Sequence, residues 1–312
     1  MNNTNDFLPR ISVVVCTCGR DVFLTEALLS LTGQSLPEEQ YEIIVVENGP
    51  VGKAKEIVQD FQKKSVHITY LYEPLQGLSR AKNAGVKKAS GKYLAFMDDD
   101  AIADKLWLAN ILKAFETHAN AGAVGGKIEP IWGGTRASWI TDDLLKYLSV
   151  LDYGDEPASL DRARLFGGNM AFVKESLEQI GGFLPNLGRK GDNLLSGEEA
   201  FAQTQLKQQG YDIIYAPDIR IQHHIPAERL CRDWFEKRAV WEGISNAVMD
   251  SKQNSIRKGW IVLCEAMSFI RKPKQLFAIV FNLKKDSFFP SRIEAKIKLS
   301  RITNLFKKLP PS

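Results

Sequence analysis

An apolar run that ends abruptly in three carboxylates constrains this chain more than any other stretch. Residues 93–97 are apolar over the length of one strand, and Asp98, Asp99 and Asp100 follow directly. A continuous apolar run of this length is typical of a strand that is buried on both faces. Because unpaired charges inside such a core are costly, we expect the aspartates at the carboxyl end of the strand. Open α/β sheets bind their ligands at that end.

Adjacent carboxylates repel one another, and a divalent cation relieves that repulsion. Mg²⁺ and Mn²⁺ prefer oxygen ligands and often join one or two carboxylates to the phosphates of a substrate. Mn²⁺ or Mg²⁺ is therefore the cofactor that we expect here. The alternative is a solvated acidic turn in front of a helix, with Asp100 or Asp104 as the N-cap.

Strands and helices alternate through the first half of the chain. The expected strands are residues 11–16, 41–46, 66–72 and 93–97, and the expected helices are 21–33, 51–64 and 78–89. Short connections in such an alternation indicate parallel strands joined by right-handed crossovers. Polar residues follow or end three of these strands, at Thr17, Glu47 and Asp98, and we expect them to line one crevice. The dinucleotide-binding pattern G-x-G-x-x-G does not follow the first strand.

The second half is less regular. The expected helices are residues 104–118, 174–180 and 198–209, and the expected strands are 123–128, 171–173, 212–215 and 219–222. Residues 130–164 read as an irregular segment with a short helix. From residue 227 onward the pattern is helical.

Charge is divided unevenly along the chain. Residues 251–312 carry 14 Lys/Arg and 3 Asp/Glu, a net charge of +11, whereas the whole chain carries +4. Such a basic tail suggests an anionic partner. Residues 291–308 resemble a basic amphipathic helix that lies on an anionic membrane surface. The alternatives are a helix that packs on its own domain and a contact in an oligomer.

The four cysteines, Cys16, Cys18, Cys231 and Cys264, show neither zinc-ligand spacing nor a useful disulfide spacing. We therefore expect reduced thiols in a cytosolic protein. Residues 1–6 are polar rather than an apolar signal region, and no apolar run reaches the roughly 18–20 residues of a membrane span. We expect a cytoplasmic protein, with peripheral attachment to the inner face of the membrane as an option, and no nucleic-acid partner.

Several motifs, taken in order, resemble the family 2 glycosyltransferases, which have the GT-A fold, and in particular the bacterial polysaccharide-biosynthesis type. The motifs are residues 11–17, 43–49, 77–85, 91–100, 167–170, 197–199 and 215–223. Each motif alone is weak, but the ordered set is specific. The resemblance implies an α/β fold with a mostly parallel, Rossmann-like sheet flanked by helices over residues 1–226, whose acceptor half begins at about 123. Residues 227–312 would then be a basic helical C-terminal extension.

The resemblance also implies a reaction. Family members move a sugar from a nucleotide-diphosphate donor, commonly a uridine diphosphate sugar, to a hydroxyl of a glycan or lipid-linked saccharide, with inversion at the anomeric carbon. A nucleotidyltransferase is one alternative, but residues 17–20 are a poor match to its Gly-rich basic loop. A non-catalytic nucleotide-sugar-binding scaffold at the membrane is another.

The family pattern assigns the acidic triplet to metal and nucleotide. Matched position by position, Asp98 lies near the ribose and Asp100 is the main metal ligand, with Asp99 sharing that role. His223 matches a position that completes the metal or diphosphate site in some relatives. A structural role is the alternative for this histidine.

Three more positions match nucleotide contacts of the family. Thr17 and Glu47 correspond to residues that hold the nucleobase and ribose, although the family residue at position 47 is usually Asp. Arg80 corresponds to a basic residue that contacts the nucleotide, and a solvated helix arginine is its alternative reading.

The family's acidic motif at a helix start matches Glu198 and Glu199. An inverting transfer needs a general base for the acceptor hydroxyl, and a helix N-terminus favours an ionised carboxylate. Glu199 is the expected base and Glu198 the alternative, with a helix-capping acid pair as the structural reading. Gly168 and Asn169 are expected to contact the donor sugar or the acceptor.

Overall fold

The computed structural model describes residues 8–64, 67–161, 163–251, 253–283 and 285–307. Predictions that include residues 1–6, 66, 162, 252, 284 or 308–312 lie partly outside this range. The chain divides into two units. Met1–Ile131, Ser149–Leu184 and Glu198–His224 form the first unit, and Trp132–Leu148, Pro185–Gly197 and Ile225–Ser312 form the second. The predicted boundary at residue 226 stays a prediction. Two segments that precede it also belong to the helical second unit.

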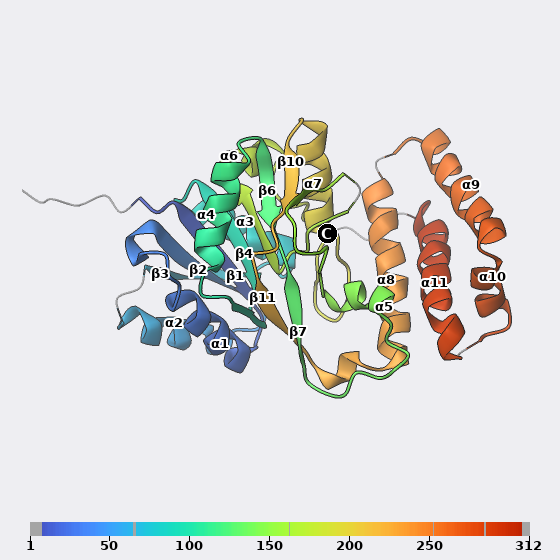
Figure 1. The fold of residues 1–312 in the computed structure, drawn as a ribbon, viewed down its shortest axis with the longest axis horizontal. Coiled ribbons are helices and arrows are strands. Elements are labelled where there is room, and N and C mark those ends of the chain that lie inside the picture. The colour runs from blue at the N-terminus through green and yellow to red at the C-terminus, as the bar shows by residue number, and fades with distance from the viewer. Residues whose placement is uncertain (1–7, 65–66, 162, 252, 284, 308–312) are drawn as a thin grey trace, which may run out of the picture. The chain divides into compact units, whose positions relative to one another are not determined.

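A mixed sheet forms the centre of the first unit (Figure 1), with the strand order β3-β2-β1-β4-β9-β6-β10-β8. The strands are β1 Ile11–Thr17, β2 Tyr41–Asn48, β3 Ile68–Glu73, β4 Tyr93–Asp98, β6 Ala121–Gly125, β8 Ala158–Ser159, β9 Asn169–Val173 and β10 Asp212–Tyr215. The first four predicted strands pair in parallel, as the alternation with helices predicted. β9 differs, because it runs antiparallel between β4 and β6.

Helices flank this sheet. They are α1 Asp21–Thr32, α2 Ala54–Gln62, α3 Leu78–Lys88, α4 Trp107–Thr117, α6 Lys174–Gln179 and α7 Glu198–Gln208, with a short 3-10 helix at Glu38–Gln40. β1 and β2 are buried along almost their whole length, as their continuous apolar sequences predicted. α3 packs closely on β1, since a Cβ atom at Gly85 would lie 2.4 Å from Cγ1 of Val14.

A second, smaller sheet has the strand order β5-β11-β7. Its strands are β5 Ala101–Ala103, β7 Ile128–Trp132 and β11 Ile221–Ile225. The single strand predicted at 123–128 is therefore wrong, because Gly126 divides β6 from β7. A Cβ atom at Gly126 would lie 2.2 Å from the carbonyl oxygen of Ala216, so only glycine permits this close approach.

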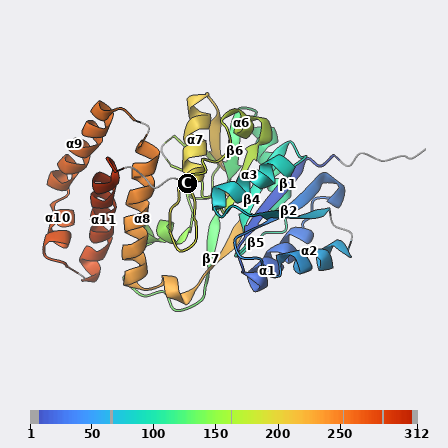
Figure 2. The same cartoon turned by 180° about the vertical axis from the view of Figure 1, so that it is seen from behind.

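The second unit is helical, as the sequence after residue 227 predicted. Its helices are α5 Asp142–Leu145, α8 Arg232–Asp250, α9 Ser255–Arg271, α10 Pro273–Val280 and α11 Phe289–Asn304, and its 3-10 helices are Lys146–Leu148, Ala227–Arg229 and Asp286–Phe288. Within this unit, α11 lies between α8 on one side and α9 and α10 on the other (Figures 1 and 2). Among the described residues, we find no helix that combines the length and the apolar character needed to cross a membrane.

α11 corresponds to the amphipathic helix predicted at 291–308, and its apolar side is covered. Phe289, Ile293 and Leu305 are buried. The basic residue Arg292 donates to Glu236 of α8 at 2.9 Å. The structure therefore supports packing on its own domain, which was the alternative to a membrane-lying helix.

Candidate active site

Strand register brings the predicted polar residues to one edge of the large sheet. Thr17 pairs with Glu47 across β1 and β2. Cys16, the residue before Thr17, pairs with Asp98 across β1 and β4. The carboxyl ends of these parallel strands are therefore level, as expected for residues that line one crevice.

Asp98, Asp100 and His223 form a potential metal-binding cluster at this edge. His223 reaches it because β11 runs antiparallel to β5, which places His223 opposite Ala101. One ligand atom from each of the three residues lies within 4.8 Å of the others. Two carboxylates and an imidazole are donors that Mn²⁺ accepts, so the donor set fits a divalent cation. Nδ1 of His223 is buried and has no hydrogen-bond partner among the described residues.

Arg20 belongs to this site, although the sequence did not identify it. Its Nη1 donates to Oδ1 of Asp99 at 3.0 Å and to Oδ2 of Asp100 at 2.6 Å. The hydroxyl of Thr17 donates to Oδ2 of Asp99 at 2.7 Å. Both carboxylate oxygens of Asp99 thus have protein partners. Oδ1 of Asp100 lies 3.4 Å from Nε2 of His223, and Asp100, unlike Asp99, belongs to the potential metal-binding cluster.

The aspartates are more buried than a solvated turn would be. Asp99 and Asp100 are each 5% exposed. Burial raises the pKa of Asp99 to about 6, and the charge of Asp100 adds to the rise while Arg20 opposes it. Burial lowers the pKa of the Arg20 guanidinium, but Asp99 and Asp100 outweigh it and raise that pKa overall. A single arginine therefore neutralises only part of the charge of three carboxylates.

A second acidic group, the pair Glu198 and Glu199, begins α7. A buried lysine from α3 contacts both carboxylates. Nζ of Lys82 lies 3.1 Å from Oε1 of Glu198 and also donates to Oε1 of Glu199. Lys82 was not predicted for the site. The helical spacing gave an indication, because Lys82 shares the inward-facing stripe of α3 with Ala81 and Gly85.

The two glutamates differ in protonation behaviour. Burial raises the pKa of Glu199 to about 7, and the neighbouring charge of Glu198 adds to this. Burial also raises the pKa of Glu198, but Lys82 outweighs it, and the pKa of Glu198 falls below its usual value. The Glu199 side chain is 15% exposed and that of Glu198 only 2%. A carboxylate that is accessible and has a pKa near 7 suits a general base.

Gly167 and Gly168 connect the two acidic groups. A Cβ atom at Gly167 would lie 1.8 Å from Oε1 of Glu199. A Cβ atom at Gly168 would lie 2.8 Å from Oδ2 of Asp98. Since these glycines are neighbours in the chain, the turn that they form lies against both Glu199 and Asp98.

Sequence comparison identifies the family. A family model described as "Glycosyl transferase family 2" matches residues 12–181. The chain belongs to this family. It is therefore a glycosyltransferase of glycan or polysaccharide biosynthesis, as the ordered motifs predicted.

The transferase is similar to several curated proteins. It is 26% identical over 244 residues to glucosyl-dolichyl phosphate glucuronosyltransferase of Haloferax volcanii, and the match covers 77% of each chain. It is 26% identical over 264 residues to the succinoglycan biosynthesis protein ExoM of Rhizobium meliloti, which covers 83% of this chain and 81% of that protein.

A solved structure confirms the predicted GT-A fold. The mannosyltransferase PcManGT from Pyrobaculum calidifontis, in complex with GDP-Man and Mn²⁺, superposes on the transferase with a TM-score of 0.61. The sequence identity is 17%, and the match covers 96% of this chain and 88% of the other.

Asn169, which was expected to contact a sugar, has a structural role in this transferase. Its side chain is fully buried. Its Oδ1 accepts from Nε1 of Trp107 at 2.7 Å, and its Nδ2 donates to the carbonyl oxygens of Lys127 at 2.9 Å and Ile219 at 2.8 Å. Both amide protons are used within the protein, so we leave Asn169 out of the proposed sugar site.

Glu47 also has partners within the protein. Its Oε1 accepts from the backbone N–H of Gly52 at 2.7 Å, and its Oε2 accepts from the hydroxyl of Tyr70 at 2.6 Å. Glu47 is fully buried and positions the loop after β2. Its contact with a nucleobase stays a prediction. So does the nucleotide contact of Arg80, which lies half-buried in the first turn of α3.

The thiol of Cys16 lies close to the acidic triplet, since Cys16 pairs with Asp98 across β1 and β4. All four cysteines are free, as predicted. Burial raises the pKa of the Cys16 thiol to about 12. Cys16 therefore stays protonated beneath the site and is a poor nucleophile.

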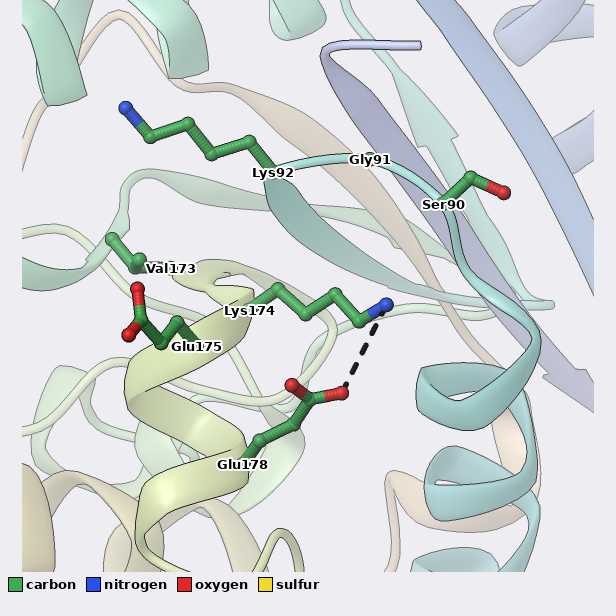
Figure 3. Close-up of a pocket in the computed structure, with 7 residues that line it drawn as sticks. All are labelled: Ser90, Gly91, Lys92, Val173, Lys174, Glu175 and Glu178. Atoms are coloured by element: carbon green, nitrogen blue, oxygen red, sulfur yellow. Dashed lines mark ion pairs between the residues drawn. The ribbon is translucent and has the colours of Figure 1, made fainter. Parts of the chain in front are cut away.

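A separate pocket of about 270 Å³ lies at the opposite end of β4 from the aspartates (Figure 3). Lys174 and Glu178 of α6 face each other there at 3.8 Å. Its lining residues are Ser90, Gly91, Lys92, Val173, Lys174, Glu175 and Glu178. None of them was predicted for the active site, and we assign the pocket no part in transfer.

Replacing Gly167 with alanine is expected to displace Glu199. The new methyl group would overlap Oε1 of Glu199, whose flexible side chain must turn away. We expect transfer activity to fall by about a hundredfold, because catalysis depends on the placement of the reacting groups. The melting temperature, measured alongside, should fall by only a few degrees.

Gly259→Ala is the matched control, since among the described residues no atom beyond the chain neighbours and the local backbone of α9 lies within 4 Å of the added Cβ position. This control should retain activity and gain up to about 1 kcal/mol of stability. Wild-type activity in Gly167→Ala would contradict the proposed placement of Glu199.

Proposed function

We propose that the transferase is a metal-dependent inverting enzyme that moves a sugar from a nucleotide-diphosphate sugar, most simply a uridine diphosphate sugar, to an acceptor hydroxyl. One observation carries the proposal. Asp98, which forms a donor set suited to a divalent cation with Asp100 and His223, lies against Gly168. Glu199, whose pKa is raised to about 7, lies against the neighbouring Gly167.

Asp98, Asp100 and His223 would hold the divalent cation. When bound, the cation supplies positive charge that stabilises the diphosphate as it leaves. Arg20 adds a fixed positive charge on the same carboxylates and keeps Asp99 and Asp100 in position. The solved mannosyltransferase is a complex with Mn²⁺, which supports Mn²⁺ as the first metal to test.

Glu199 would take the proton from the acceptor hydroxyl. A sugar hydroxyl has a pKa far above 7, so its attack on the anomeric carbon needs a base. A single displacement by the oxygen activated in this way inverts that carbon. Lys82 and Glu198 are positioning residues in this scheme, because the buried ion pairs fix Glu199 at the start of α7.

The names of the relatives suggest the class of acceptor. One relative is named for a dolichyl phosphate-linked glucose and the other for a polysaccharide, succinoglycan. We propose that the acceptor is the sugar end of a lipid-linked saccharide or a growing glycan.

A nucleotide panel tests the proposed donor and metal. We would measure the melting temperature with nucleoside diphosphates and nucleotide sugars, each with Mn²⁺ or with a chelator. A ligand at about 100 times its dissociation constant stabilises the folded state by about 2.7 kcal/mol. We therefore expect a rise of about 5 °C with one nucleotide family, and only with Mn²⁺.

This experiment has two controls. One is the same nucleotide with chelator, and the other is the same Mn²⁺ concentration without nucleotide. Neither should reproduce the full shift. If no nucleoside diphosphate raises the melting temperature in Mn²⁺, or if the shift is equal in chelator, the proposed metal–nucleotide site is wrong.

A further inference from the structure

α9 carries an apolar stripe that remains exposed. Ile256, Trp260, Leu263, Met267 and Ile270 follow one another at intervals of three or four residues. Residues at these intervals share one side of a helix. Their exposed fractions range from 42% to 80%, and none of the residues of α9 is buried.

The apolar surface continues on α10. Leu276, Phe277, Val280 and Phe281 are 48% to 63% exposed. The rings of Phe277 and Phe281 stack with their centroids 5.2 Å apart. Both helices lie on the side of α11 that faces away from α8 (Figures 1 and 2). Together these nine side chains form the α9–α10 surface.

Scattered exposed apolar residues are ordinary, whereas a contiguous set of this size marks a binding surface. Four exposed basic residues flank the set: Arg257, Arg271, Lys272 and Lys274. Lys272 lies 3.6 Å from Glu294 of α11, and the other three add the positive charge of the margin. The only acidic residue from position 255 to position 281 is Glu265. It faces the other way and pairs with Arg301 of α11 at 2.8 Å. The α9–α10 surface is therefore apolar with a basic margin.

We propose that the α9–α10 surface docks on an anionic lipid bilayer. Tryptophan and phenylalanine side chains enter the interface between headgroups and acyl chains, while the flanking lysines and arginines meet the acidic headgroups. Each basic residue near such a surface adds to the attraction. The α9–α10 surface, and not α11, is therefore the proposed membrane contact, because the apolar side of α11 is buried within its own unit.

Charge distinguishes a lipid surface from a second copy of the chain. A symmetric contact through the α9–α10 surface would bring the basic margins of two copies together, with Glu265 turned inward in both. An anionic bilayer meets the same margin with opposite charge. Docking on a bilayer is independent of the proposed reaction, because the α9–α10 surface includes no residue of the metal site or of the acidic pair at α7.

Vesicle sedimentation with the full chain tests this proposal. The probes are vesicles of phosphatidylcholine alone and vesicles that also contain phosphatidylglycerol. We expect binding to the anionic vesicles that weakens as salt is raised. The variant Trp260→Glu/Phe277→Glu should bind at least about tenfold more weakly, because it removes two large apolar groups and adds two negative charges.

Leu299→Glu is the control, since it places one negative charge on an exposed apolar position of α11, outside the α9–α10 surface. It should bind like the wild type. Arg257→Glu/Arg271→Glu provides a second test, and should lose binding to the anionic vesicles while keeping the apolar side chains. All variants should retain the melting temperature of the wild type within a few degrees.

Three results would overturn the proposal. The first is a wild-type chain that ignores anionic vesicles. The second is wild-type binding by Trp260→Glu/Phe277→Glu. The third is a wild-type chain that does not bind vesicles but self-associates, and loses that self-association in the same variant, which would assign the surface to a second copy.

Discussion

Replacing Glu199 with glutamine is expected to lower the rate of sugar transfer by about 10²–10⁴-fold, the usual contribution of a general base. Glutamine has nearly the same shape but cannot accept the proton of the acceptor hydroxyl. It also keeps an oxygen for Lys82, so the fold of the acidic pair should survive. Binding of the donor and of Mn²⁺ should stay within about twofold, because neither contacts Glu199 in the proposed scheme.

The pH dependence of the wild type gives the same test in another form. Glu199 can act as a base only when it is ionised, and its pKa is raised to about 7. The value of kcat/KM should therefore be low below pH 7, rise with pH through about 7, and level off above it. This limb should disappear from the residual activity of Glu199→Gln.

Two variants control this prediction. Glu178→Gln changes a half-exposed carboxylate of α6 that pairs with Lys174, and should leave transfer unchanged. Glu198→Gln removes the charge of one partner of Lys82 and should cost less activity than Glu199→Gln. If Glu198→Gln instead abolishes transfer while Glu199→Gln retains it, Glu198 is the base.

Asp100→Asn is the second substitution with a large expected effect. The amide keeps an oxygen for Arg20 but removes the charge that would bind a divalent cation. We expect transfer to fall by at least about a hundredfold. The additional stabilisation that Mn²⁺ gives to a nucleoside diphosphate complex should also be lost, as measured by melting temperature.

Asp60→Asn is the matched control, since Asp60 is exposed on α2 and pairs with nearby Lys63, away from the acidic triplet in sequence. It should leave both measurements unchanged. Asp100→Asn with normal Mn²⁺-dependent nucleotide binding would show that Asp100 is not a metal ligand.

The first half of the fold was predictable because three of its strands, β1, β2 and β4, are continuous apolar runs. A strand buried on both faces has little freedom in where it lies, and the polar residue that ends it must reach the sheet edge. That reasoning placed Thr17, Glu47 and Asp98 side by side, and the register of β1 with β2 and β4 confirms it. The family motifs then supplied the acidic pair at α7.

Contacts between distant segments were not predictable from local sequence. Asn169 follows two glycines in a motif that suggested a ligand, yet its amide is held by Trp107, 62 residues away. Lys82 and Arg20 read as ordinary basic residues until the fold brings carboxylates to them. The reversal of β9 and the division at Gly126 likewise depend on pairings across the sheet.

The packing of the basic tail was likewise not predictable from its local sequence. The pattern of residues 291–308 is amphipathic, but amphipathicity does not say whether the apolar side meets a membrane or another helix. Packing decides this, because α11 buries Phe289 and Ile293 whereas α9 leaves Trp260 exposed.

Counting the Mn²⁺ ions bound per chain tests most directly whether Asp98, Asp100 and His223 form a metal–diphosphate centre. The measurement is a titration followed by electron paramagnetic resonance, with the nucleoside diphosphate that the stability panel selects. We expect a single saturable Mn²⁺ site in the wild type that weakens sharply in Asp100→Asn. No saturable Mn²⁺ binding in the wild type with nucleotide present, or unchanged binding in Asp100→Asn, would contradict the metal centre proposed for this glycosyltransferase.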